Sequence, residues 1–142
     1  LNFTNFATNV DTLYRRLNIL TISINLKNTT MTFFGAVASV FKNYANFRGR
    51  ARRKEYWYFV LFNIIISLLL IVIPFAPILW GLITIIPGLA LIARRLHDTG
   101  RSAWWYFIIL IPLIGSIVLF VFFLLDSQPG NNKWGPNPKG IE

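Results

Sequence analysis

Three runs without a charged residue follow one another between Tyr56 and Leu125, at 56–73, 78–93 and 103–125. As a helix, the first run would be about 27 Å long, close to the roughly 30 Å hydrocarbon core of a bilayer. The second reaches a similar length when it is extended back to 76. A soluble helical core would need polar faces at helical spacing, and none of the runs has one. We therefore expect an all-α integral membrane protein with three transmembrane helices at about 56–73, 76–93 and 103–125.

The composition agrees with a membrane protein. The chain is 55% hydrophobic and 13% charged, whereas soluble domains carry about a quarter charged residues. Its net charge of +9 is concentrated at the ends of the apolar runs. Basic residues at the ends of apolar runs typically orient a membrane protein in the bilayer, so we expect no nucleic-acid partner. The chain has no cysteine, which excludes disulfides, thiolate metal sites and cysteine nucleophiles.

The first thirty residues differ from the rest. They are rich in Asn and Thr, show no sustained helical or strand period, and lack the apolar core of a signal peptide. Met31 is the only methionine, so the simplest interpretation is a natural start at Met31, with 1–30 a non-native or disordered extension. The alternative is a genuine extension with a short strand at 20–26. The expected domains are then 1–30, a membrane domain at 31–127 and an irregular tail at 128–142.

An amphipathic helix is expected at about 32–45, ahead of the first span. Its apolar residues recur at helical spacing on one face: Phe33, Val37, Val40, Phe41 and Tyr44. The segment is too short and too polar to span. Two interpretations remain open: an interfacial helix in the headgroup plane, or an ordinary helix packed on the cytoplasmic ends of the bundle.

The orientation follows from where Lys and Arg lie. They flank the first span and fill the 94–101 loop but are absent from the 74–77 turn. This places the N-terminus and the 94–101 loop in the cytoplasm, and the 74–77 turn and the C-terminus outside. Pro112 and Gly115 raise a second option, a re-entrant hairpin that returns the tail to the cytoplasm. We expect one kinked span, because each arm would be too short to cross and a turn in hydrocarbon leaves backbone groups unpaired.

The block "ARRLHDTGRSAWW" at 93–105 places five charged or titratable residues between two apolar runs. In a structural reading, Arg94 and Arg95 favour the end of a helix, Gly100 allows the turn and Ser102 caps the next helix. Glu55 and Asp98 are the candidate charge partners of the surrounding cations. The expected membrane-interface anchors are Trp57, Trp104 and Trp105.

A second reading of the block is an anionic-lipid or partner site. Arginine offers bidentate donors to lipid phosphate, and each basic residue near an anionic leaflet contributes about 1 kcal/mol. Such a cluster suits cardiolipin or phosphatidylglycerol and is compatible with the structural reading. The candidate residues are Arg52, Arg53, Arg94, Arg95 and Arg101.

Enzyme and transport functions receive less support from the residues. His97 and Asp98 are adjacent and point about 100° apart on a helix, so they do not form a catalytic pair. We expect no catalytic residues, no cofactor and no metal site. A subunit of a membrane transport assembly remains the alternative, although the spans hold no ionisable residue of the kind that ion pathways use. Small and polar residues instead predict close helix packing, within one molecule or across a homo-oligomer: Asn63, Ser67, Gly81, Thr84 and Gly88.

Four motifs carry a resemblance to a known family: "FRGRARRKEYW" (47–57), "RRLHDTGRSAWW" (94–105), "LIPLIGSIVL" (110–119) and "PGNNKWGPNP" (129–138). In order and spacing they resemble the bacterial inner-membrane proteins of the domain-of-unknown-function 805 family, over about 31–139. Ala51 and Trp134 depart from the usual serine and tyrosine. The resemblance implies a small multi-pass protein of the bacterial cytoplasmic membrane and no established activity. We expect a structural, lipid-associated or partner-binding component, in contact with the bilayer and with a second copy or another membrane protein.

Overall fold

The structure, a computed structural model, describes residues 10–22 and 31–140. The chain divides into two units, Leu1–Thr30 and Met31–Glu142. In the first unit, residues 10–22 form a helix, although the sequence showed no sustained helical period there. Arg15 and Asp11 pair at 3.0 Å across one turn of this helix, a spacing that supports isolated helices. Of the alternative strand at 20–26, residues 20–22 are helical and 23–26 lie outside the described residues.

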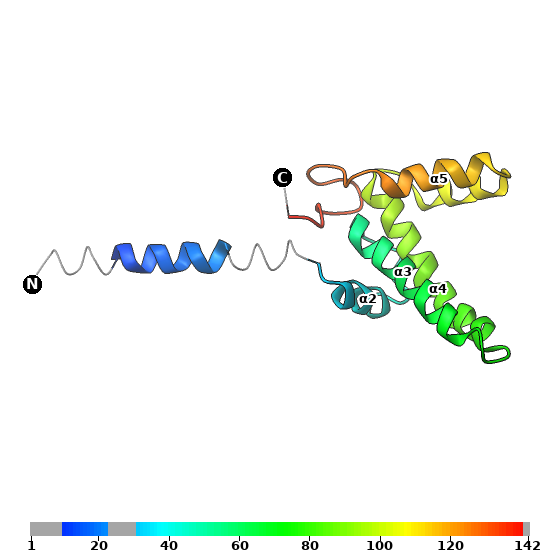
Figure 1. Cartoon of the computed structure of the whole chain (residues 1–142). Helices are drawn as coiled ribbons and strands as arrows, with labels where there is room; N and C mark the ends of the chain where they lie inside the picture. The colour runs from blue at the N-terminus through cyan, green and yellow to red at the C-terminus, as the bar shows by residue number, and fades with distance from the viewer. Residues whose placement is uncertain (1–9, 23–30, 141–142) are drawn as a thin grey trace, which may run out of the picture. The chain divides into compact units, whose positions relative to one another are not determined.

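The second unit is helical, which confirms the all-α prediction. Within residues 31–140 the only strand-like feature is an isolated bridge between Asn132 and Gly135. Four α-helices and one 3-10 helix follow in order (Figure 1): α2 at Phe33–Lys42, α3 at Arg53–Leu70, α4 at Ala76–Asp98, η1 at Ala103–Leu110 and α5 at Ile114–Leu124.

Helix α2 begins at a side-chain cap and packs its apolar face on α3. The Thr32 hydroxyl accepts from the Gly35 N–H at 3.2 Å, which satisfies one of the free donors of the first turn. The helix buries Ala36, Val37 and Val40. It ends at Lys42, three residues before the predicted end. The predicted amphipathic helix is therefore present and packed on its neighbours, and its placement in the headgroup plane stays a prediction.

Helices α3 and α4 form an antiparallel pair joined by the turn at 71–75 (Figure 1). The charged start of α3 lies beside the charged end of α4, where the N–H of Ala51, just before α3, donates to the Arg94 carbonyl at 3.0 Å. A core of Val40, Ala51, Phe59 and Leu91 holds the pair and α2 together. Among the described residues, α4 is the one helix that is long and apolar enough to cross a membrane, judged by length and composition only. Helix α3 includes charged residues in its first turn.

The predicted single span at 103–125 is wrong. The chain folds back at 111–113, so that η1 and α5 lie side by side as a hairpin (Figure 1). Gly115 permits this approach, since a Cβ there would lie 1.8 Å from the Ile108 carbonyl oxygen. The turn also leaves few donors unpaired. Pro112 has no N–H, and the Ile111 and Gly115 N–H groups bind the Ile108 and Ile111 carbonyls at 3.0 and 2.9 Å.

The hairpin packs on the charged end of α4 through a second core of Leu96, Leu119 and Phe123. The chain after α5 therefore returns to that end, where the Gln128 N–H donates to the Asp98 carbonyl at 2.9 Å. The sequence predicted the C-terminus on the opposite side of the membrane from the 94–101 loop, whereas in the structure the described tail lies against the end of α4 that leads into this loop. The described tail, 125–140, contains no helix.

Candidate functional site

Three segments distant in sequence meet at the C-terminal end of α4: the linker before α3, the last turn of α4 and the tail. A Schellman motif ends α4, with the Arg101 N–H on the Leu96 carbonyl at 2.9 Å and the Gly100 N–H on the His97 carbonyl at 3.0 Å. Gly100 adopts φ +78°, as this motif requires. The turn and the Ser102 cap of η1 agree with the sequence analysis.

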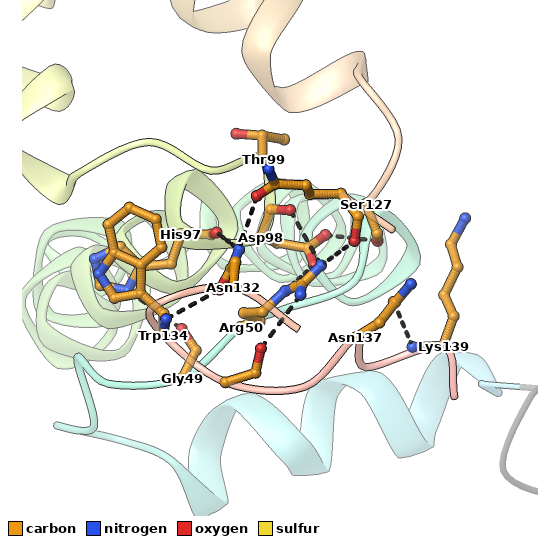
Figure 2. A network of polar contacts seen from close by, with 12 residues as sticks. Gly49, Arg50, His97, Asp98, Thr99, Ser127, Asn132, Trp134, Asn137 and Lys139 are labelled. Carbon is orange, nitrogen blue, oxygen red and sulfur yellow. Dashed lines mark hydrogen bonds and ion pairs between the residues drawn. The ribbon is translucent and has the colours of Figure 1, made fainter. Parts of the chain in front are cut away.

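The centre of the site is the carboxylate of Asp98, which is fully buried. It accepts from Arg50 Nε at 3.0 Å, from Arg95 Nη1 at 2.6 Å and from the Ser127 hydroxyl at 2.6 Å. Figure 2 shows Arg50 and Ser127 reaching Asp98 from the linker and the tail. A buried carboxylate is tolerated only when its charge is paired and its oxygens are hydrogen-bonded, and both conditions are met here.

Arg50 also fixes the tail. Its guanidinium donates to the carbonyls of Gln128 and of Gly130, the latter at 2.8 Å, and makes a longer contact of 3.3 Å with the Gly135 carbonyl. The Arg50 side chain is 1% exposed. In the sequence, Arg50 is only one of several cations that precede the first span. Its acceptors are backbone carbonyls about eighty positions away, which no local pattern reveals.

Arginines likewise bind the last carbonyls of α5. Arg95 Nη2 donates to the Phe123 carbonyl at 3.3 Å and to the Leu125 carbonyl, and Arg53 Nη1 donates to the Leu124 carbonyl at 3.1 Å. The final four carbonyls of a helix have no intrahelical partner, and cations at that end also favour the helix dipole. These bonds therefore hold the returning arm of the hairpin against the charged end of α4.

A second buried ion pair joins α4 to α3 and α2. Arg94 Nη1 lies 3.1 Å from Glu55 Oε1, which also accepts from the Ser39 hydroxyl at 3.1 Å. Both charged side chains are 5% exposed. Arg94 Nε and Nη2 and Arg95 Nε are buried without a hydrogen-bond partner. Of the two candidate charge partners, Glu55 thus lies against Arg94 and Asp98 lies against Arg95.

His97 faces the tail. Its ring stacks on Trp134, with centroids 4.6 Å apart and planes 11° apart, and its Nδ1 lies 3.2 Å from the Gly49 carbonyl (Figure 2). The Asn132 amide donates to the His97 carbonyl at 2.9 Å. Lys133 Nζ lies 4.2 Å from the centre of the Trp134 ring, within cation–π range. The stack packs the tail onto α4.

The arginines of the predicted lipid site differ in burial. Arg94 and Arg95 are 4% and 0% exposed and are held by carboxylates and carbonyls, so neither reaches a headgroup in this arrangement. Arg53 is exposed, and Arg101 is half-buried with its guanidinium 3.9 Å from the centre of the Phe122 ring. Arg52 is half-buried at the start of α3. A lipid site can therefore use only the outer members of the predicted set.

The predicted packing residues separate into two groups. Asn63 Oδ1 accepts from Trp80 Nε1 at 3.1 Å, and Asn63, Thr84 and Gly88 line one groove between α3 and α4. Gly81 has nothing within 4 Å of the position of a Cβ, and Ser67 lies outside that groove. The helix pair therefore uses a tryptophan–asparagine bond in place of the predicted small-residue contact.

The three predicted anchors differ in exposure. Trp104 is 77% exposed and Trp105 is 48% exposed, both at the start of η1 next to the charged loop. Trp57 is half-buried, with its ring against Tyr56 and Phe120. Within the described segments, no group of three His, Asp or Glu side chains is placed to hold a metal ion.

Comparison with known proteins supports the resemblance seen in the motifs. Inner membrane protein YhaI of Escherichia coli K12 is 47% identical over 109 residues, which cover 71% of this chain and 92% of YhaI. Inner membrane protein YhaH of the same strain is 44% identical over 112 residues, 70% of this chain and 93% of YhaH. No solved structure matches. A family model described as "Protein of unknown function (DUF805)" matches residues 44–136. The chain therefore belongs to the DUF805 family, whose relatives are bacterial inner membrane proteins.

Proposed function

We propose that this protein is a multi-pass, lipid-associated scaffold of the bacterial inner membrane. In this proposal α3 and α4 cross the bilayer, and the η1–α5 hairpin enters only its cytoplasmic half. All polar segments, including the tail, then lie on the cytoplasmic face. The observation that carries the proposal is the convergence of linker, α4 end and tail on the buried Asp98 cluster at one end of the helix pair.

Connectivity supports two spans. Helix α4 has the length and composition of a span. Its N-terminal end joins α3 through the short turn at 71–75, and its C-terminal end lies beside the start of α3 through the bond from Ala51 to Arg94. If α4 crosses, α3 must therefore cross beside it. The uncharged run at 56–73 is long enough to do so.

Dimensions support a half-entering hairpin. The eight residues of η1 extend about 16 Å as a 3-10 helix, and the eleven of α5 about 17 Å as an α-helix. Each arm is about half the hydrocarbon thickness of roughly 30 Å. The tip is apolar and exposed, with Leu110 at 76% and Leu113 at 75%. Such a tip suits hydrocarbon, provided that its backbone donors are paired, as those of Ile111 and Gly115 are.

Charge supports both the orientation and the lipid association. Several basic residues at or near the charged end are exposed or half-buried, and we call five of them the cationic rim: Arg48, Arg53, Lys54, Arg101 and Lys133. Basic residues favour the cytoplasmic side. Each of them near an anionic leaflet contributes about 1 kcal/mol of attraction. In this proposal the buried Asp98 cluster holds the linker, the end of α4 and the tail together, and the surrounding cationic rim binds lipid headgroups.

Topology can be tested with single cysteines, because the chain has none of its own. Val72→Cys lies in the exposed turn after α3, and Asn131→Cys lies in the exposed part of the tail. With a membrane-impermeant maleimide on intact bacterial cells, we expect labelling of the Val72→Cys protein only. The Asn131→Cys protein should react after lysis. Labelling of Asn131→Cys in intact cells would overturn the hairpin topology.

Lipid association is tested by charge removal on the rim. The protein with Arg48, Lys54 and Lys133 changed to Gln should retain less phosphatidylglycerol after purification than the unchanged protein. A control with Arg15, Arg16 and Lys42 changed to Gln loses the same charge from residues that do not belong to the rim. Equal retention by the two variants would show that net charge alone governs association, which would contradict a rim-specific role.

A further inference from the structure

We propose that one acyl chain of an anionic phospholipid occupies a groove bounded by α3, α4 and the hairpin, with the lipid phosphate on Arg53. The inference rests on the proposed function and names the site where a lipid is held individually. The groove, its mouth and the shape of the occupant each support it.

The groove consists of two adjoining cavities of about 280 Å³ each. One lies between α3 and α4, over Val60, Asn63, Thr84 and Gly88. The other continues between α4 and the hairpin, over Ile109, Leu119 and Phe120. Tyr56 and Ile92 line both cavities, so the two adjoin at these side chains. The lining is mainly aliphatic and aromatic, and its polar side chains Asn63, Thr84 and Ser116 already make hydrogen bonds.

Arg53 stands at the charged end of this groove. Residues 53, 56, 60 and 64 fall on one face of α3, at steps of three, four and four. Arg53 therefore lies one helical turn before Tyr56, where the two cavities adjoin. Its bond to the Leu124 carbonyl places it between α3 and the end of α5. That bond uses one of five N–H donors, and the residue is otherwise exposed.

A phospholipid fits this arrangement better than a partner helix does. The joined cavities have the size of small-molecule pockets, roughly 300–1,000 Å³. A helix about 10 Å across would lie over the groove and leave its floor empty. A guanidinium at one end of a long apolar groove instead matches an amphiphile with a phosphate at one end and a hydrocarbon chain behind it. The occupant belongs to the same leaflet as the hairpin.

The groove can be filled by a single substitution. Gly88 lines the first cavity, and a Cβ there would meet nothing within 4 Å, so the side chain added by Gly88→Leu begins in open space within the groove. Gly81 lies on the same helix with equally open space but outside the lining, so Gly81→Leu is the matched control. Ile64→Trp, at an exposed lining position, fills the same cavity from α3 if Gly88→Leu does not fold.

The measurement is native mass spectrometry of the purified full chain titrated with phosphatidylglycerol and, separately, with phosphatidylcholine. Gly88→Leu should weaken binding of both lipids at least about tenfold, because a Leu side chain takes the space of several methylenes. Arg53→Gln should weaken phosphatidylglycerol binding about fivefold and select less well against phosphatidylcholine. Gly81→Leu should bind as the unchanged protein does.

The outcomes separate the two proposals. If Gly88→Leu and Ile64→Trp retain phosphatidylglycerol as Gly81→Leu does, while the rim variant loses it, the scaffold proposal stands and the groove site is refuted. If the unchanged protein shows no preference for phosphatidylglycerol at all, the proposed function itself fails. If Gly88→Leu loses the lipid and instead gains or loses a dimer peak, the groove holds a second copy and the lipid assignment is overturned.

Discussion

Helix α4 and the run at 103–125 look alike as sequences and fold differently. Both are long, apolar and uncharged over most of their length, and each contains a proline closely followed by a glycine. Helix α4 continues through Pro87 and Gly88 for 23 residues. In the other run η1 ends at Leu110, the chain turns around Pro112, and α5 runs back alongside η1. A proline in an apolar run is therefore not by itself a turn, and the surroundings of each proline show why.

In α4 the defect is repaired by another helix end. Pro87 has no N–H, so the Ile83 carbonyl lacks its normal partner four residues on. The hydroxyl of Tyr44, just after α2, donates to that carbonyl at 2.7 Å. An unpaired carbonyl is costly in hydrocarbon, and side chains of neighbouring elements commonly satisfy one that a proline has freed. The bond satisfies the carbonyl that Pro87 leaves free, and α4 continues through this point as a single helix.

In the hairpin the same kind of defect is used as a turn. Leu113 takes φ +63°, an uncommon conformation for a branched side chain. The cost is offset by the contacts of the returning arm, whose last carbonyls bind Arg95 and Arg53. Gly115 lets the two arms touch, whereas Gly88 has open space above it. The difference between the two runs thus lies in tertiary contacts.

The largest effect is expected from Asp98→Asn, which removes the charge that holds the end of α4 and the tail together. Arg50 and Arg95 would then share no carboxylate, and breaking a buried pair costs about 3–5 kcal/mol. We expect the free energy of unfolding in detergent to fall by that amount and the tail to become sensitive to protease. Glu55→Gln tests the other buried pair. A loss below about 1 kcal/mol for Asp98→Asn would show that the cluster does not hold the fold.

Gly115→Ala should open the hairpin, at a cost of about 3 kcal/mol, the upper range for overpacking. The added methyl would overlap the Ile108 backbone, which cannot move as a flexible side chain could. The matched control is Gly88→Ala, where the methyl has space and the helix gains propensity.

Opening of the hairpin can be followed with cysteines in place of Trp105 and Phe122, whose rings lie 5.8 Å apart on opposite arms. A short bifunctional thiol reagent should join this pair in the parent chain and in the Gly88→Ala chain, and much less in the Gly115→Ala chain. Equal cross-linking in all three would contradict the role given to Gly115 and would leave the hairpin to be explained by Pro112 and the arginines.

Tyr44→Phe tests the repair in α4. Removing the hydroxyl leaves the Ile83 carbonyl unpaired, which costs about 1–3 kcal/mol for a group away from water. In a Pro87→Ala background, the restored N–H can bind this carbonyl, so the same change should cost much less. A double-mutant cycle on the free energy of unfolding measures the difference. Equal costs in the two backgrounds would show that Tyr44 acts through packing alone.

The sequence predicted the parts that depend on local pattern. The uncharged runs located α3 and α4 to within a few residues of their observed bounds, and Gly100 and Ser102 marked the turn and cap between α4 and η1. Arg95 and Asp98 are three residues apart on one helix, so their contact was within reach of spacing rules. The family assignment depended on such local motifs and is shown by the comparisons.

What the sequence could not predict depends on distant partners. Arg50 binds carbonyls of the tail, and nothing near Arg50 identifies them. The direction of the run at 103–125 was misjudged because both objections to a hairpin, short arms and unpaired backbone, assumed an isolated segment. The arginines that bind the end of α5 come from α3 and α4, and they supply the contacts which that reasoning left out.

The smallest expected effect concerns the exposed ion pair between Asp126 and Lys139, which joins the two ends of the tail. Asp126 accepts from Lys139 Nζ and from the Ser127 N–H, and the Lys139 bond is the main reason that the pKa of Asp126 lies below its usual 3.8. Because the carboxylate is more acidic in the folded protein, its stabilising effect is present above pH 3.8 and is lost as the pH falls through the lowered pKa.

The Asp126 side chain is 60% exposed, so Asp126→Asn should cost less than about 1 kcal/mol near neutral pH, and less still at high salt. The difference between the parent and Asp126→Asn chains, measured as the free energy of unfolding, should vanish in acid below that range. A difference that stays constant through the acid range would mean that the amide disturbs the turn at Ser127 and that the charge of the Asp126–Lys139 ion pair adds nothing to the stability. Comparison with Asp98→Asn then shows how much more a buried carboxylate with two arginine partners contributes to stability than an exposed one with a single lysine partner.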